Sequence, residues 1–260
     1  MASNNKLCTF LLVLAGMVCL PFFVSAQTVE FMADRPGATT GPEILPKGRV
    51  QWETGFATER SALEGPWSRT WTINTSLIRV GFSDFAEFRL QADYLLHATS
   101  DGVRTTGFDD VMFGFKARLV EGRKWIPQVA LMANAFIPGK DASPFMSSEW
   151  GGPIALLCEN EVTSWFSIGY EADLIWEGEE AEPDVFFGGC LGFKPWKRFS
   201  IFLEEFNRST SRGIKSWMEL SLAFQLAPRV QIDVATDLRL HNPDKYRIIM
   251  LGVIWQITKR

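Results

Sequence analysis

Hydrophobic and polar residues alternate along most of this chain. Between Trp217 and Leu226 the even positions are apolar, and the odd positions include Glu219, Ser221 and Gln225. The same period of two runs through residues 87–96, 110–119, 166–176 and 230–239. Helical spacing does not persist for three turns anywhere. A period of two predicts β-strands that have one apolar and one polar face.

The alternating segments predict about twelve strands joined by connections of two kinds. Tight turns such as 83–85 and 163–164 alternate with longer loops at 61–68, 98–107, 138–151, 178–182 and 208–214. This pattern favours an all-β fold, an antiparallel up-and-down transmembrane β-barrel covering residues 48–260. The strands are expected near residues 48–60, 69–82, 86–97, 108–120, 125–137, 152–162, 165–177, 183–194, 199–207, 215–226, 229–240 and 245–257.

Tryptophans at the strand ends favour the barrel over its rival, a secreted soluble β-sandwich, which would also alternate. Trp125, Trp165 and Trp196 lie beside proposed short turns, and Trp176 and Trp217 lie beside proposed long loops. Amphipathic rings at both ends of the strands are typical of the aromatic girdles of a membrane barrel. These five tryptophans are therefore predicted to form the girdles.

Charged residues on the polar strand faces are predicted to line the lumen. A single Arg or Lys facing lipid at mid-bilayer costs roughly 2–4 kcal/mol, so these side chains must point inward. About twelve strands enclose a narrow lumen, between the filled interior of eight strands and the open pore of sixteen. The lumen-lining candidates are Glu53, Glu87, Arg89, Asp93, Lys116, Arg118, Glu159, Glu161, Glu171, Asp173, Glu204, Glu219, Asp233, Asp237 and Arg239.

The N-terminus has the organisation of a secretory signal peptide. Lys6 precedes an apolar run from Phe10 to Val24, and small residues follow at Ser25 and Ala26. We expect a Sec-type signal peptide at residues 1–26, cleaved before Gln27. Residues 27–47 would then form a periplasmic N-terminal segment or a partial plug. Export combined with a barrel predicts the outer membrane of a Gram-negative cell.

Composition excludes several other classes of protein. The chain has 26 Lys+Arg against 30 Asp+Glu, a formal charge of -4, which gives no reason to expect nucleic acid as a partner. It has 2 His and 4 Cys, too few for a zinc protein or a disulfide scaffold. We therefore predict no metal and no cofactor.

The start of the mature chain resembles a known family. Asp34-Arg35-Pro36-Gly37, Gln51-Trp52-Glu53-Thr54-Gly55-Phe56 and Leu77-Ile78-Arg79-Val80-Gly81-Phe82 are similar to strings in the outer-membrane barrel family named for a MetA pathway of phenol degradation. The resemblance implies a channel-like barrel for small organic compounds, without established catalytic residues. Many such barrels end on an aromatic residue that the barrel-assembly machinery recognises. Here the chain ends Ile257-Thr258-Lys259-Arg260, which leaves Trp255 to serve in its place.

The sequence therefore predicts a passive outer-membrane channel or transporter for a small organic solute, with lipid and the solute as its partners. Two alternatives stay open: a lipid-modifying hydrolase and a structural surface barrel without transport. Neither His97 nor His241 has a serine two residues away, the spacing that outer-membrane lipid hydrolases use. An enzyme is thus not expected. The pattern does not determine the oligomeric state.

Overall fold

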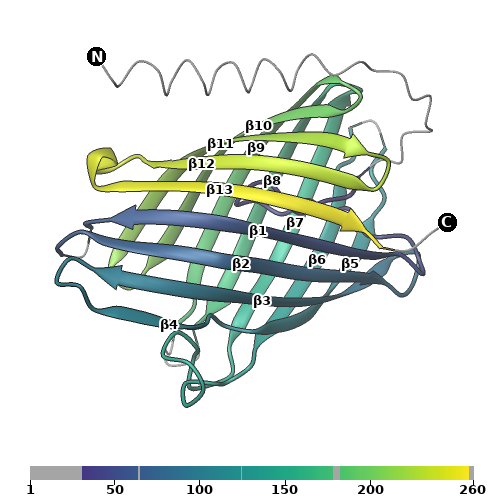
Figure 1. The fold of residues 1–260 in the computed structure, drawn as a ribbon. Helices are drawn as coiled ribbons and strands as arrows, with labels where there is room; N and C mark the ends of the chain where they lie inside the picture. Colours follow the sequence, from purple (N-terminus) through teal and green to yellow (C-terminus); the bar gives the residue numbers. More distant parts are fainter. Residues whose placement is uncertain (1–30, 64, 124, 178–181, 258–260) are drawn as a thin grey trace, which may run out of the picture.

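The computed structural model describes residues 31–63, 65–123, 125–177 and 182–257 of the chain. The predicted signal peptide at residues 1–26 lies outside these described residues. The described chain is almost entirely β-structure (Figure 1). Its elements are β1 (Val50–Ser61), β2 (Ser68–Gly81), β3 (Ala86–Thr99), β4 (Arg104–Phe108), β5 (Met112–Val120), β6 (Gln128–Phe136), β7 (Gly152–Thr163), β8 (Phe166–Trp176), β9 (Asp184–Trp196), β10 (Phe199–Thr210), β11 (Gly213–Ala227), β12 (Val230–Arg239), a short 3₁₀ turn η1 (Pro243–Lys245) and β13 (Tyr246–Gln256).

The strands form one antiparallel sheet that closes on itself. Each strand from β5 to β13 pairs with its sequence neighbour, and β1 pairs with both β2 and β13. The ring is completed by the β2–β3 and β3–β5 pairs. Closure satisfies the backbone hydrogen bonds within the wall, which is the condition for spanning a lipid bilayer with strands. The predicted antiparallel barrel of about twelve strands is confirmed.

Two of the predicted long loops are wrong. The predicted loop at 98–107 contains β4, which pairs with Tyr94–Ala98 of β3 while β5 pairs with Ala86–Gln91 of the same strand. β4 and β5 are thus two parts of one strand position, separated by residues 109–111. The thirteen described strands therefore occupy twelve positions around the barrel. The predicted loop at 208–214 is a tight turn, because β10 extends to Thr210 and β11 starts at Gly213. The strands of both hairpins extend beyond the segments in which apolar and polar residues alternate. Their ends carry polar residues on both faces, so the pattern did not reveal them.

Alternation places two different surfaces on the two sides of the wall. On β11, Leu220 is 48% exposed on the outside, whereas its neighbours Glu219 and Ser221 are 1% and 0% exposed. On β13, Leu251 is 52% exposed, and Ile254 on the other face is buried. No described helix is long and apolar enough to cross a membrane. The wall therefore presents most of its large apolar side chains outward and most of its charged ones inward.

Candidate functional site

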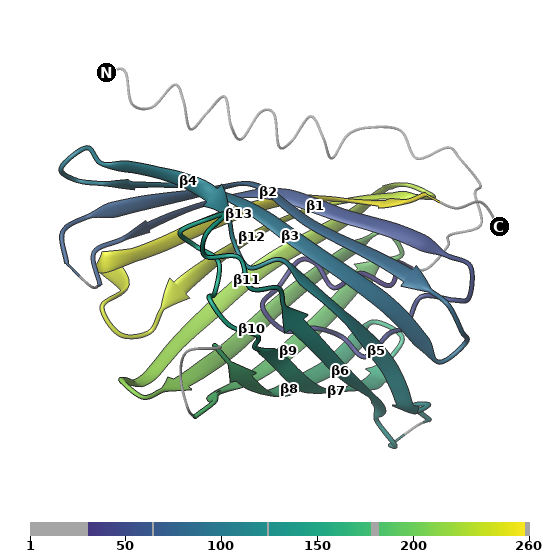
Figure 2. The same ribbon diagram turned by 90° about the horizontal axis from the view of Figure 1, so that it is seen from below.

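The N-terminal segment, residues 31–47, runs inside the ring of strands (Figure 2). It has no regular secondary structure, and its polar groups bond to side chains of the wall. Thr39 donates from its N–H and its hydroxyl to Oε2 of Glu204, at 2.8 and 2.6 Å. The Thr40 N–H donates to Oε2 of Glu171 at 2.6 Å. Wall carboxylates thus replace the backbone partners that a strand would supply.

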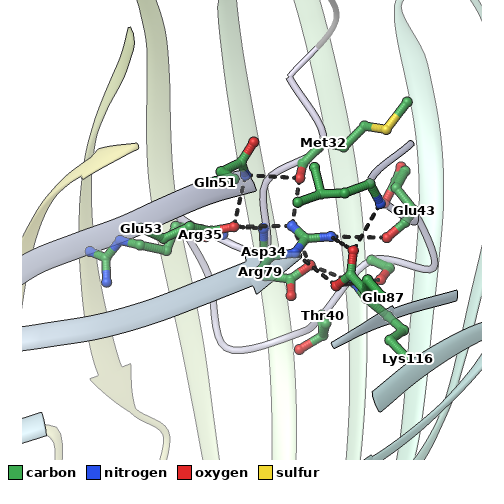
Figure 3. Close-up of polar contacts among 12 residues, drawn as sticks. Met32, Asp34, Arg35, Thr40, Glu43, Gln51, Glu53, Arg79, Glu87 and Lys116 are labelled. Atoms are coloured by element: carbon green, nitrogen blue, oxygen red, sulfur yellow. Dashed lines mark hydrogen bonds and ion pairs between the residues drawn. The ribbon is translucent and has the colours of Figure 1, made fainter. Parts of the chain in front are cut away.

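Arg79 is the centre of a buried charge cluster between this segment and β1–β5 (Figure 3). Its Nε and Nη2 donate to the two oxygens of Glu87 at 2.8 and 2.9 Å, and its Nη1 lies 3.0 Å from Glu53 Oε1. Nη1 and Nη2 also donate to the carbonyls of Met32 and Glu43, at 2.5 and 3.1 Å. A two-pronged arginine–carboxylate pair is geometrically specific, so these bonds fix the position of the segment.

Asp34 joins the segment to three cations of the wall. Its carboxylate lies 2.7 Å from Lys116 Nζ and 3.2 Å from Arg79 Nη1, and it also contacts Arg89 Nη1. Burial by itself would raise the pKa of Asp34, but the three cations hold that pKa well below its ordinary value. Asp34, Glu53 and Glu87 balance the charges of Arg79, Arg89 and Lys116. The cluster is therefore neutral only while the segment is in place.

A second ion pair holds the segment at the β1–β13 seam. Arg35 Nη2 lies 3.1 Å from Oδ1 of Asp233. Gly55 and Gly252 face each other in register beneath this arginine. A Cβ at Gly252 would lie 2.4 Å from both Arg35 Nε and Asp233 Oδ1, so a side chain there would displace the pair. Gly37, at φ 120°, likewise brings the backbone against Glu204, because a Cβ there would lie 2.1 Å from Glu204 Oε1.

A cavity of about 460 Å³ lies between the segment and the wall at the end of the barrel with the short turns. Glu43 from the segment and Glu159 and Glu161 from β7 line it, with Arg118 and Arg123 at its rim. Burial, together with the neighbouring charge of Glu159, raises the pKa of Glu43 to about 8. A second cavity of about 140 Å³ extends deeper, beside Thr39 and Cys190. Polar, solute-sized space therefore adjoins the segment.

The structure distributes the sequence-predicted lumen residues unevenly. Ten are buried; they are Glu53, Glu87, Arg89, Lys116, Glu171, Asp173, Glu204, Glu219, Asp233 and Asp237. Asp93, Arg118, Glu159 and Arg239 are half-buried, and Glu161 is exposed. Only Glu53, Glu87, Arg89 and Lys116 meet in the Arg79 cluster. Asp93 stands apart from it, with one oxygen accepting the Ser76 N–H at 3.2 Å.

Sequence reasoning missed Arg79, Asp34 and Arg35. Arg79 lies between Ile78 and Val80, and an arginine at one alternate position of an apolar strand end is a signal for an inward charge. Asp34 and Arg35 precede the first strand, where no periodic pattern indicates a direction. Their role follows from the fold of the segment.

One of the five proposed girdle residues is placed wrongly. Trp217 shares the inner face of β11 with Glu219, and its ring stacks on Phe206, a buried residue, at 5.3 Å. Its odd position opposite Arg239 on β12 makes it part of the inner wall. Trp125, Trp165 and Trp196 are exposed at the short-turn end, at 89%, 55% and 69%. Trp176 is half-buried on the outer face of β8, as its even position requires.

A closed antiparallel barrel with an apolar exterior and a charged interior has the architecture of outer-membrane channels. Residues 33–192 match the family model described as "Putative MetA-pathway of phenol degradation", and the chain belongs to this family. No curated protein matches the chain.

Solved structures support the same architecture. The COG4313 outer membrane channel from Pseudomonas putida F1 is similar with a TM-score of 0.62 and 12% identity, over 86% of this chain and 99% of that one. The NanC porin has a TM-score of 0.56 and 8% identity, over 80% and 100% of the two chains. The KdgM porin has a TM-score of 0.50 and 10% identity, over 79% and 99%. At these identities the likeness concerns the fold.

Proposed function

We propose that this protein is a passive channel for a small organic solute in the outer membrane of a Gram-negative bacterium. The observation that carries the proposal is a closed barrel whose inner wall is charged and whose interior holds a cavity of about 460 Å³. A stable soluble barrel would not need exposed leucines such as Leu220 and Leu251 around its outside. A structural barrel would not need a polar cavity inside.

Known proteins support a channel for small organic compounds. The family takes its description from phenol degradation, and the similar structures are an outer membrane channel and two porins. The KdgM porin also has a structure in complex with disordered oligogalacturonate. We therefore expect a solute of modest size, because the cavity is smaller than the lumen of a large porin.

The N-terminal segment acts in this proposal as a partial plug that withdraws from the wall to let solute pass. Its buried apolar side chains include Ile44 and Leu45. Its attachment is nonetheless largely polar, with ion pairs through Asp34 and Arg35 and hydrogen bonds through Thr39 and Thr40. Water can replace such bonds when the segment leaves, whereas an apolar interface would have to be exposed. A plug held by ion pairs and hydrogen bonds that water can replace on release is therefore suited to reversible release.

The lipid-hydrolase alternative has less support. His97 on β3 shares a hydrogen bond of 3.0 Å with Thr70 Oγ1, and an activated nucleophile would need a third group to orient this ring. Hydrolysis of phospholipid in mixed micelles by the purified protein, lost in His97→Ala, would favour this alternative.

Solute flux into liposomes tests the channel directly. Purified, refolded protein is reconstituted, and swelling is followed with small neutral, anionic and cationic solutes and with a polymer too large for the cavity. We expect swelling with small solutes and none with the polymer, and no swelling in protein-free liposomes. Equal rates with and without protein for every solute would overturn the channel function. The gel shift between unheated and boiled samples checks that the reconstituted barrel is folded.

A further inference from the structure

Four aromatic side chains meet on the inner wall, at the opposite end from the large cavity. Phe206 stacks on Trp217 with ring centroids 5.3 Å apart and planes at 14°. Phe186 lies 5.9 Å from Phe206, and Tyr246 lies 6.5 Å from Trp217. They come from four strands, β9, β10, β11 and β13, so the cluster extends beyond a single hairpin. We call these residues the aromatic patch.

Carboxylates adjoin the aromatic patch along the same strands. Glu219 is opposite Glu204 in the β10–β11 register and opposite Asp237 in the β11–β12 register. Glu204 and Glu219 are each two residues from a ring of the patch, Phe206 and Trp217, and so share its face of the wall. Glu204, Glu219 and Asp237 thus lie at the same level on three adjacent strands. We call these three residues the acidic step.

Within the acidic step, Glu204 accepts two hydrogen bonds from Thr39, but neither Glu219 nor Asp237 is in an ion pair among the described residues. Glu219 is 1% exposed; its carboxyl group lies beside Asp237 and Ser221, and no N–H group among the described residues donates to it. Asp237 Oδ1 and Ser221 Oγ likewise receive no N–H donor, while two donors beside them, Trp217 Nε1 and Arg239 Nε, have no acceptor among the described residues. Buried polar atoms in proteins are almost always paired, and a buried charge needs a counter-charge. This concentration of unpaired acceptors points to a ligand that brings N–H donors and positive charge.

The other cations of the lumen that could reach these acids are bound to other carboxylates. Arg35 pairs with Asp233, and Arg208 pairs with Asp184 and contacts Glu177. Arg239 faces the step, and its guanidinium carbon lies 5.5 Å from the centroid of the Trp217 ring. Its contact shows that this ring face accommodates a cation.

Two further groups face Asp237: Tyr246 from the neighbouring strand β13, and Glu59 from β1, the strand beyond it. Glu59 adds negative charge to the step, and the Tyr246 hydroxyl bonds to Glu59. One arginine is therefore opposed by Glu59, Glu204, Glu219 and Asp237, in contrast to the balanced Arg79 cluster on the other side of the lumen.

We propose that the aromatic patch and the acidic step together bind a small organic cation, a protonated amine carried on an aromatic or alkyl body. The amine would donate to Glu219 and Asp237, and the body would lie against Phe206 and Trp217. An aromatic surface beside carboxylates is the usual chemistry for recognising such cations. No group of three or more His, Cys, Asp or Glu side chains in the described part of the chain is arranged to hold a metal ion. This inference rests on the proposed channel function and assigns it a substrate class.

Equilibrium binding to the full-length protein in detergent tests the site. The probes are 2-phenylethylammonium, 2-phenylethanol and phenylacetate, which share a body and differ in charge, followed by calorimetry or Trp fluorescence. We expect the amine to bind tightest and Glu219→Gln to weaken its binding by about tenfold or more, the effect of losing a charged hydrogen-bond partner. Glu205→Gln is the matched control, because Glu205 is the exposed neighbour of Glu204 on the other face of β10.

Several outcomes would overturn the site. These are equal binding of the alcohol or the acid, unchanged amine binding in Glu219→Gln, or competition by Ca²⁺ or K⁺ as strong as that by the amine. Unchanged binding would indicate that Glu219 and Asp237 share a proton and need no cation. The gel shift on boiling confirms that each variant is folded. A barrel that passes solutes but does not bind the amine contradicts only this inference. A barrel that binds the amine but never passes solute contradicts the channel function.

Discussion

Removing the Asp34 carboxylate should release the N-terminal segment from the wall. In Asp34→Ala the segment loses its contacts with Lys116 at 2.7 Å and with Arg79 at 3.2 Å, and its contact with Arg89. Breaking one side of a buried ion pair typically costs 3–5 kcal/mol because the partner charge is left uncompensated. This cost is paid only in the docked state, since the three cations are hydrated once the segment leaves.

The lower end of that range applies here. Arg79 keeps Glu53 and Glu87 as partners in the variant, so its charge is still paired. A loss of about 3 kcal/mol corresponds to a change of about a hundredfold in the docking equilibrium. The folded barrel should be unaffected, because none of its strand pairs involves Asp34.

Cys190 is a natural reporter of docking. It lies on the wall beside Thr39, next to the smaller cavity, and it is a free cysteine. A bulky maleimide reagent should reach it only when the segment is released, so its labelling rate follows the released fraction. We expect labelling about a hundredfold faster in Asp34→Ala than in the wild type. Lys47→Ala, at an exposed position of the same segment, is the control.

A labelling rate in Asp34→Ala equal to that of Lys47→Ala and of the wild type would refute the reasoning. Such a result would mean that the charge cluster does not hold the segment. A rate increase in both variants would instead mean that any change in the segment releases it. Single-channel recordings of the same proteins should show that only Asp34→Ala spends a larger fraction of time in the open state.

Three further predictions concern the membrane face, pH and packing. Leu220→Arg should impair assembly, with a cost of roughly 2–4 kcal/mol, while Ser221→Ala on the opposite face should not; urea unfolding in lipid vesicles measures both. Because the pKa of Glu43 is about 8 when docked and about 4.5 when free, docking should weaken as pH rises from 4.5 to 8 and then level off. Cys190 labelling, divided at each pH by the labelling rate of a free thiol, should lose that dependence in Glu43→Gln, and a retained pH profile would assign it to another group. Gly252→Leu should expel Arg35 and speed labelling in a barrel that still shifts on boiling; an unchanged rate would show that the arginine does not hold the segment.

The wall of this barrel was predictable from sequence because its two faces lie in different media. Lipid on one side and charge on the other impose a strict period of two, which located every strand except β4 to within a few residues. The same period assigns Trp217 to the inner face, since it is two positions from Glu219. Its place beside a proposed loop outweighed that signal and led to the wrong prediction.

The contents of the lumen were not predictable in the same way. The segment at residues 31–47 has no repeating pattern, and its path is set by single bonds such as those of Asp34 and Thr39 to the wall. Such bonds depend on which strands face each other across the barrel, which follows only from closure of the sheet. β4 was missed for a related reason. β4 pairs with the end of β3, and both faces of β4 are polar or exposed, so no alternation marks it in the sequence.

A reversible lock between the segment and the wall tests the central claim most directly. Thr39→Cys places a thiol beside Cys190, and Cys158→Ser removes the other cysteine among the described residues. Solute flux into liposomes is measured with the oxidised protein and again after reduction. A channel opened by release of the segment predicts that oxidation abolishes flux and that reduction restores it to the wild-type rate. Flux through the oxidised, fully cross-linked protein as fast as through the reduced protein would contradict the account.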